Sequence, residues 1–188
     1  MTVRTVQTDA AGLDAAAESL LGGGVVVVPT DTVYGLAAHP GFPDAVDRLY
    51  TIKARDAGKP IALLASDAAC AGRFVGAEAA AVGARHWPGA LTVVVAAADG
   101  RATEGFRIPD HAWTRELLRR CGGVLRVTSA NLSGRRPATD APQALADVGL
   151  SADLVVDDGV SPGGVPSTVV RVAADGSYEI LREGAVTI

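Results

Sequence analysis

The two lysines of this chain lie together in one short loop. Of its 17 basic residues only Lys53 and Lys59 are lysines, with Arg55 between them, in the stretch Thr51-Ile-Lys-Ala-Arg-Asp-Ala-Gly-Lys-Pro60. A lysine carries a compact charge on a flexible stem and an arginine carries a planar fork, and phosphate sites use both. Three close cations in a loop with a glycine therefore predict an anion pocket, with a solvated loop as the open alternative.

Polar side chains suited to small-molecule recognition fall in four segments, which we place after strands. They are residues 29–35, 53–59, 103–107 with 109–111, and 127–134. In open α/β sheets the residues just beyond strand ends line the ligand crevice. Taken singly, each segment has an ordinary explanation, since Thr30 and Asp31 can cap a helix and residues 129–134 can form a turn. The pair Asp157-Asp158 could hold magnesium, but a solvated loop is the favoured interpretation.

Several familiar catalytic patterns are missing from the sequence. It has neither a GxxxxGK[ST] phosphate loop nor a GxGxxG after a strand. No GxSxG surrounds a serine and Ser129 has no obvious histidine partner, which disfavours an acyl-enzyme. Cys70 and Cys121 are isolated, so neither a disulfide framework nor a zinc site is indicated.

Composition and charge limit the class of protein. The 188 residues carry a formal net charge of −4, which argues against broad coating of a nucleic acid. No apolar run approaches the ~20 residues that a membrane span needs, and the N-terminus lacks a signal core. We therefore expect a cytoplasmic protein with one domain over residues 1–188, no membrane contact and weak or no direct nucleic-acid binding.

Predicted helices and strands alternate along the chain without a linker. The run Val25–Val28 is typical of a strand buried on both faces, and Asp99-Gly100 is expected to form a turn. Helices are predicted at 14–21, 43–52, 66–74, 77–86, 114–120 and 143–147, and strands at 25–28, 61–65, 91–97, 103–108, 124–128, 154–156, 167–173 and 178–181. This order predicts an α/β fold in which a mixed sheet is flanked by helices.

Seven motifs together resemble one known family. They are Pro29-Thr-Asp-Thr-Val-Tyr-Gly-Leu36, Lys53-Ala-Arg55 with Lys59-Pro60, Trp87-Pro-Gly-Ala-Leu-Thr92, Arg107-Ile-Pro-Asp-His111, Thr128-Ser-Ala-Asn-Leu-Ser-Gly134, Gly164-Val-Pro-Ser-Thr-Val169 and Leu181-Arg-Glu-Gly184. In this order and spacing the chain resembles the YrdC (TsaC) family of L-threonylcarbamoyladenylate synthases, of which the KxR and SxN pair is the hallmark.

The resemblance implies a fold, a reaction and its participants. The fold is a twisted mixed sheet flanked by helices and curled around a deep cleft. The reaction turns L-threonine, bicarbonate and ATP into L-threonylcarbamoyl-AMP and pyrophosphate, the first step of the threonylcarbamoyl modification of tRNA adenosine. ATP is a substrate, and magnesium would arrive on its phosphates without a protein cage. A transient contact with the tRNA threonylcarbamoyl-transferase complex is also implied.

The same resemblance assigns site residues where the motifs match. The implied catalytic residues are Lys53, Arg55, Ser129 and Asn131. The implied ATP-binding residues are Lys53, Arg55, Lys59, Thr103, Gly105, Asn131, Thr139 and Arg182. The implied threonine-binding residues are Thr32, Arg107, Ser129 and Thr168. No metal ligand is assigned. Such a displacement at phosphorus needs positioning and charge neutralisation more than a covalent nucleophile, which suits this cation-rich set.

The sequence departs from the family at two positions, and other functions stay open. Glu183 stands where relatives often have proline, and Leu64 where some have histidine, which implies fewer contacts to threonine. Longer members append a second domain over the cleft, which this chain is expected to lack. One alternative is an RNA-binding module of the same fold, disfavoured by the net charge and few aromatics. The other is a paralogue with a different carbamoyl or adenylate reaction.

Overall fold

Strand β2 (Val25–Val28) shows how the sequence sets the two faces of the sheet. All four valines are buried. Successive side chains of a strand point to opposite faces, and here Val25 and Val27 join one apolar core while Val26 and Val28 join another. A strand buried on both faces requires helices on both, so the four-valine run fixes β2 as an interior strand.

The computed structural model describes residues 3–96 and 102–188, and over these residues ten strands form one mixed sheet. The strands are β1 (Arg4–Gln7), β2, β3 (Gly35–Ala38), β4 (Leu63–Ala65), β5 (Leu91–Ala96), β6 (Thr103–Arg107), β7 (Val124–Ser129), β8 (Leu154–Asp157), β9 (Thr168–Val172) and β10 (Tyr178–Arg182). Their order across the sheet is β1-β8-β2-β3-β7-β4-β6-β5-β9-β10. Parallel and antiparallel pairs alternate irregularly, with β2 parallel to β8 but antiparallel to β3.

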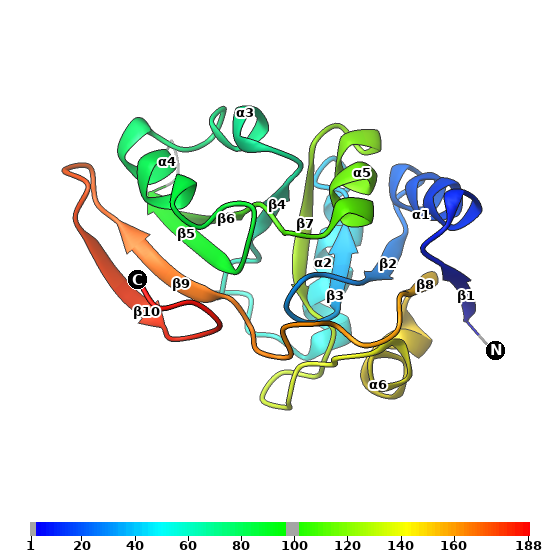
Figure 1. Cartoon of the computed structure of the whole chain (residues 1–188). Coiled ribbons are helices and arrows are strands. Elements are labelled where there is room, and N and C mark those ends of the chain that lie inside the picture. Colours follow the sequence, from blue (N-terminus) through cyan, green and yellow to red (C-terminus); the bar gives the residue numbers. More distant parts are fainter. Residues whose placement is uncertain (1–2, 97–101) are drawn as a thin grey trace.

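Helices cover the sheet from both sides (Figure 1). They are α1 (Ala10–Leu21), α2 (Pro43–Lys53), α3 (Ala68–Ala71), α4 (Ala77–Ala84), α5 (Ala112–Arg120) and α6 (Ala141–Asp147), with a 3-10 turn η1 (Gly149–Ser151). Helices α1 and α5 pack on the core that contains Val26, while α2 and α6 pack on the core that contains Val25. Helix α4 covers the end of the sheet formed by β5, β6 and β9. Of the helices in residues 3–96 and 102–188, none combines the length and apolarity needed to cross a membrane.

Strands β5 and β9 divide their side chains between a helix and an open face. Leu91 and Val93 of β5 pack beneath α4, whereas Thr92 and Val94 line a cavity on the other side of the sheet. Val170 of β9 belongs to the core under α4. On this face polar side chains of the strands line the cavity, where they are available to a ligand.

The predicted mixed sheet with flanking helices is confirmed, as are β2 and the hairpin of β9 and β10. Two strands, β1 and β3, were not predicted. The sequence of β3, Gly-Leu-Ala-Ala, has little strand propensity, and the strand forms because it pairs with β2 and β7. A Cβ at Gly35 would lie 2.6 Å from a methyl of Val127, so this close approach requires glycine.

The placement of all four polar segments after strands is wrong in two cases. Residues 53–59 follow helix α2, and residues 103–107 are themselves strand β6. The chain reaches the cavity from the loop after a helix and from within a strand, so the cavity is lined by more than strand ends. The predicted turn at Asp99-Gly100 lies outside the described residues.

Candidate active site

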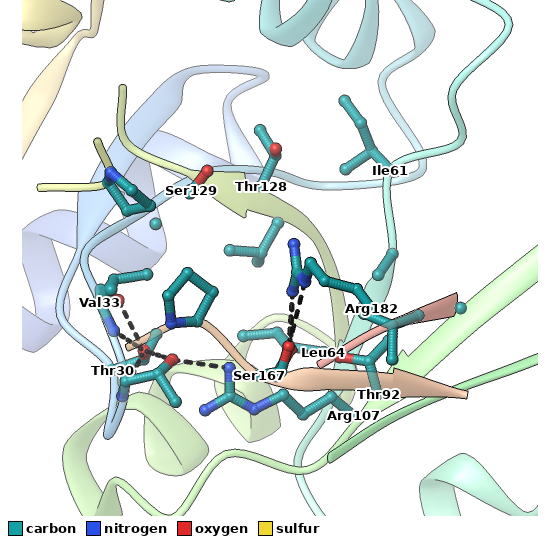
Figure 2. Close-up of a pocket in the computed structure, with 18 of the residues that line it drawn as sticks. Thr30, Val33, Ile61, Leu64, Thr92, Arg107, Thr128, Ser129, Ser167 and Arg182 are labelled. Atoms are coloured by element: carbon teal, nitrogen blue, oxygen red, sulfur yellow. Dashed lines mark hydrogen bonds between the residues drawn. The ribbon is translucent and has the colours of Figure 1, made fainter. Parts of the chain in front are cut away.

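One cavity of about 350 Å³ lies on the uncovered face of the sheet (Figure 2). Its walls come from the connection between β2 and β3, the loop after α2, strands β4 to β7, and strands β9 and β10. These segments span residues 30 to 182, so the site forms only when strands far apart in the sequence come together. In the view of Figure 2, Thr128 and Ser129 lie on one side of the cavity, across from Arg107 and Ser167.

Arg107 forms one end of the cavity and is held by three neighbours. Its Nε donates to the carbonyl oxygen of Gly89 at 2.9 Å, one terminal nitrogen donates to Thr32 Oγ1 at 2.8 Å, and the other to Asp31 Oδ1 at 2.5 Å. The residue is only 6% exposed. Burial lowers the pKa of this guanidinium while Asp31 raises it again. The arginine is thus a fixed cation with a fixed countercharge.

Arg182 and Arg55 also line the cavity and are held differently, and the charge of Arg182 also lowers the pKa of Arg107. Arg182 donates to the carbonyl oxygen of Ser167 at 2.7 Å, and Arg55 donates to the carbonyl oxygens of Lys59 and Pro60 at 3.0 and 3.1 Å. Within residues 3–96 and 102–188 neither arginine pairs with a carboxylate. Burial, followed by the charge of Arg55, lowers the pKa of Arg182. Neither arginine therefore has a carboxylate partner among the described residues.

Lys53 and Asn131 lie behind the wall and do not line the cavity. Lys53 is 1% exposed, and its ammonium donates to the backbone carbonyl oxygens of Ser129 and Asn131. Asn131 donates its side-chain N–H groups to the carbonyl oxygens of Leu132 and Arg135 at 2.8 and 2.9 Å. Both side chains are occupied with the backbone of the turn that follows β7.

The structure brings together part of the predicted site. The predicted residues that line the cavity are Thr32, Arg55, Thr103, Gly105, Arg107, Ser129 and Arg182. The predicted residues outside the lining are Lys53, Lys59, Asn131, Thr139 and Thr168. Lys59 is exposed on the loop after α2. Thr139 bonds to Gln143, and the hydroxyl of Thr168 donates to the carbonyl oxygen of Val186 at 2.6 Å. Their roles in binding stay predictions.

Sequence reasoning did not single out a hydroxyl pair on the cavity wall, Thr92 and Ser167. Their oxygens lie 2.8 Å apart, and Ser167 also accepts from Arg182 at 3.3 Å. Thr92 lies between two apolar residues of β5, and that alternation is the signal that would have found it, whereas Ser167 precedes β9 and no local pattern marks it. Leu64 lies on the cavity wall, where its side chain supplies apolar surface beside these hydroxyls.

The lining of the cavity contains no aspartate or glutamate among the described residues. In the same part of the chain no group of three histidine, cysteine or acidic residues could hold a metal ion. Asp157 and Asp158 lie outside the cavity lining, where Asp157 accepts from the backbone of Gly159 and Asp158 contacts Thr8 and His111. The described lining of the cavity therefore offers a metal ion no carboxylate.

Known proteins resemble the chain over nearly its whole length. Residues 18–184 match the Sua5/YciO/YrdC family model, whose description is telomere recombination. The threonylcarbamoyl-AMP synthase of Bacillus subtilis is 35% identical over 175 residues, which cover 87% of this chain and 50% of that protein. The enzyme of the same name from Alkalilimnicola ehrlichii is 36% identical over 174 residues, which cover 86% of this chain and 90% of that protein.

A solved structure has a similar fold. P. abyssi Sua5 complexed with L-threonine superposes with a TM-score of 0.88 at 27% identity, over 98% of this chain and 58% of that chain. The chain therefore spans about half of the B. subtilis and P. abyssi relatives and nearly all of the one from A. ehrlichii. The likeness covers every segment that lines the cavity.

Proposed function

The chain belongs to the Sua5/YciO/YrdC family, and from that premise we propose that it is a threonylcarbamoyl-AMP synthase. The observation that carries the proposal is a single cavity that holds two kinds of arginine. Arg107 is paired with Asp31, whereas Arg55 and Arg182 bond only to neutral oxygens among the described residues. A small amino acid suits the first environment, and a polyphosphate suits the second.

Threonine would bind at the end of the cavity that contains Arg107. A guanidinium has five N–H donors, and three of those on Arg107 are engaged by protein oxygens. The remaining two can receive the α-carboxylate in a fixed orientation. Thr32, next to Arg107, and Ser129, across the cavity, would supply hydroxyls, and Thr168 at the start of β9 would support the site from outside the lining. The amine would then project toward the centre of the cavity.

The chemistry proceeds in two steps that need no covalent enzyme intermediate. Threonine and bicarbonate condense to a carbamate, with loss of water and a proton. A carbamate oxygen then attacks the α-phosphorus of ATP, and the bond to the leaving pyrophosphate breaks. Both steps are accelerated when the reactants are held together and the developing charge is neutralised. Ser129, next to β3 at the end of β7, would orient the carbamate.

ATP would place its phosphates beside Arg55 and Arg182. Thr103 and Gly105 of β6 line the same cavity, and a Cβ at Gly105 would lie 3.1 Å from the Cβ of Ala62, so glycine keeps the wall open there. Lys59, Thr139 and Asn131 would border the nucleotide from the loops around the cavity. Magnesium would enter on the ATP phosphates, since the cavity offers it no carboxylate.

The product is a mixed anhydride that hydrolyses readily, so it must pass quickly to the next enzyme. The proposal therefore includes a role as the first step of threonylcarbamoyl modification of tRNA, in the cytoplasm, with transient contact to the transferase complex. Direct binding of tRNA is not required for this role, which agrees with the net charge of −4.

Pyrophosphate release tests the proposed function directly. Purified protein is mixed with ATP, magnesium, threonine and bicarbonate, and each of the last two is omitted in turn. We expect release only when both are present, together with threonylcarbamoyl-AMP detected by mass spectrometry. Release that does not depend on threonine, or tRNA binding without any turnover of ATP, would contradict the proposal.

A further inference from the structure

Lys53 places its charged end inside one turn of the protein. Its Nζ contacts the carbonyl oxygens of Ser129 and Asn131 and lies 3.4 Å from Asn131 Oδ1. An ammonium ion donates up to three hydrogen bonds and accepts no hydrogen bond, so these three oxygens match its full donor capacity. Because the residue is 1% exposed, no donor is left facing the cavity.

The backbone of Lys53 grips the same turn from its other end. The carbonyl oxygen of Lys53 accepts from the backbone N–H of Ser133 at 2.9 Å. Asn131 continues the network by donating to Leu132 and Arg135. The turn at residues 129–134 is therefore tied to the end of helix α2 at both of its sides, and Lys53 is the residue that makes both ties.

The conformation of Ala54 separates Lys53 from Arg55. Helix α2 ends at Lys53, and Ala54 adopts φ 48° and ψ 45°, a left-handed conformation that alanine rarely takes. The N–H of Arg55 then closes the helix by donating to the carbonyl oxygen of Tyr50 at 2.9 Å. The reversal sends Arg55 to the cavity wall while Lys53 stays under the turn. Two cations two residues apart thus have different surroundings.

We propose that Lys53 is a positioning residue whose ammonium holds the turn at residues 129–134 and so fixes Ser129 at the cavity wall, while Arg55 and Arg182 contact the phosphates. The inference rests on the proposed function, because it assigns Lys53 a part in that reaction. It replaces the direct phosphate contact that the KxR motif implied. Burial and then the charge of Arg55 lower the pKa of Lys53 to about 8, whereas the carbonyl oxygens around the ammonium favour its charged form.

Affinity for an unreactive nucleotide separates the two roles. The variants are Lys53→Met, which keeps the length of the stem, and Arg55→Met, and the ligand is α,β-methylene-ATP measured by calorimetry. We expect Arg55→Met to weaken binding at least about 30-fold and Lys53→Met less than about 3-fold, although Lys53→Met loses at least about 100-fold in kcat/KM for threonine. Equal weakening by both variants would make Lys53 a phosphate ligand and overturn the proposal.

Hydrogen exchange reports on the turn itself. In Lys53→Met the amides of residues 130–134 should exchange at least about 10-fold faster than in the wild type, because their local opening becomes easier. In Arg55→Met they should not change. This measurement needs no turnover, so it tests the positioning role even if the wild-type protein released no pyrophosphate and the proposed function failed. Unchanged exchange in Lys53→Met would overturn the proposal.

Two further variants keep the test decisive if Lys53→Met does not fold. Lys53→Arg retains the charge, but a planar fork does not fit three converging oxygens, so nucleotide affinity should stay within about 3-fold while kcat falls at least about 10-fold. A kcat within about 2-fold of the wild type would contradict the positioning role. The double variant Asn131→Ala with Lys53→Arg should have a kcat no lower than that of the less active single variant, because both substitutions act on one turn. Full additivity would also overturn the proposal.

Discussion

The two arginine environments of the cavity differ in how their charge is balanced. Arg107 lies 2.5 Å from Asp31 Oδ1 and donates to two further protein oxygens. Its side chain is 8% exposed. Arg182 bonds to one carbonyl and one hydroxyl of Ser167 and stands close enough to Arg55 for the two charges to repel. The charge of Arg107 is balanced by Asp31, although Arg182 also acts on it, whereas Arg55 and Arg182 have no carboxylate partner in the part of the chain that the structure describes.

This difference shows what each end demands of a substrate. A paired arginine keeps its geometry when the site is empty, so it selects a ligand by the direction of the donors that remain. Two arginines without an anion gain most from a ligand that brings several negative charges, because their mutual repulsion is then relieved. Arg107 is therefore expected to select a ligand mainly by the ligand's orientation. Arg55 and Arg182 are expected to select it mainly by its negative charge.

The largest effect should come from removing charge at the uncompensated end. Arg182→Met should lower kcat/KM for ATP by about 10³, or roughly 4 kcal/mol, because a cation that neutralises developing phosphate charge in a desolvated site is lost. Its threonine affinity should change little. Steady-state release of pyrophosphate at varied ATP checks this, with Arg171→Met, an exposed arginine on β9, as the control that keeps wild-type activity. A similar loss in Arg171→Met would show that the effect does not depend on the position of Arg182 at the cavity.

A smaller loss is expected at the compensated end, and it should fall on threonine. Arg107→Met should raise the threonine requirement about 100-fold, or roughly 3 kcal/mol, and leave the ATP requirement nearly unchanged. The single variant leaves Asp31, whose side chain is 12% exposed, without its partner, so the stability of the variant should also fall. Calorimetry of threonine binding measures the effect on the site, and unchanged affinity would show that the carboxylate binds elsewhere.

The double variant Arg107→Met with Asp31→Asn separates stability from binding. Breaking one partner of a buried ion pair is costly because the other charge is left unpaired, whereas removing both is much less so. The double variant should therefore regain most of the free energy of unfolding and still bind threonine weakly. Recovery of threonine binding along with stability would mean that Arg107 acts only on the fold.

The sequence predicted the parts of the site that depend on local pattern and missed those that depend on the fold. Strand β2 follows from four valines, whereas β3 forms from Gly-Leu-Ala-Ala only because its neighbours pair with it. The motif Pro-Ser-Thr offers two adjacent hydroxyls, and only the phase of β9 decides that Ser167 and not Thr168 lines the cavity. Asp31 and Arg107 are 76 residues apart, and no local signal joins them.

Lys53 provides a third charge environment, neither paired with a carboxylate nor open to a ligand. Its pKa, about 8 in the folded protein against 10.5 for a free side chain, means that between these values the unfolded state holds a proton that the folded state has lost. The free energy of unfolding should therefore rise with pH across this window, by at most about 3 kcal/mol at 1.4 kcal/mol per unit. Below about pH 8 both states are protonated and the cost of burying the charge is fully present.

Urea unfolding of wild type and Lys53→Met at several pH values between 7.5 and 10 measures this effect. Other groups contribute in this window, including Cys121, whose pKa is 9.0 for a free thiol and is raised by burial to about 11; they are common to both proteins and cancel in the difference. Arg55 and Asp147 are the charges that act on Lys53, and neither is altered. A difference between the two proteins that does not vary with pH would show that Lys53 keeps an ordinary pKa.

The smallest predicted effect is the preference for threonine over serine. It should depend only on the part of the cavity around Arg107. Serine lacks the methyl group of threonine, and one buried methyl contributes about 0.8 kcal/mol, so serine should be used about 4-fold less efficiently in kcat/KM. Leu64, 5% exposed on the cavity wall, offers the kind of apolar surface such a methyl needs.

The ratio of kcat/KM for threonine to kcat/KM for serine should be the same in wild type and in Arg182→Met, because that arginine acts on phosphate. Competition between serine and threonine for one limiting pool of ATP measures the ratio in both proteins. A ratio that changes in Arg182→Met would mean that the two ends of the cavity are coupled, and a ratio above about 100 would require a recognition element stronger than apolar contact.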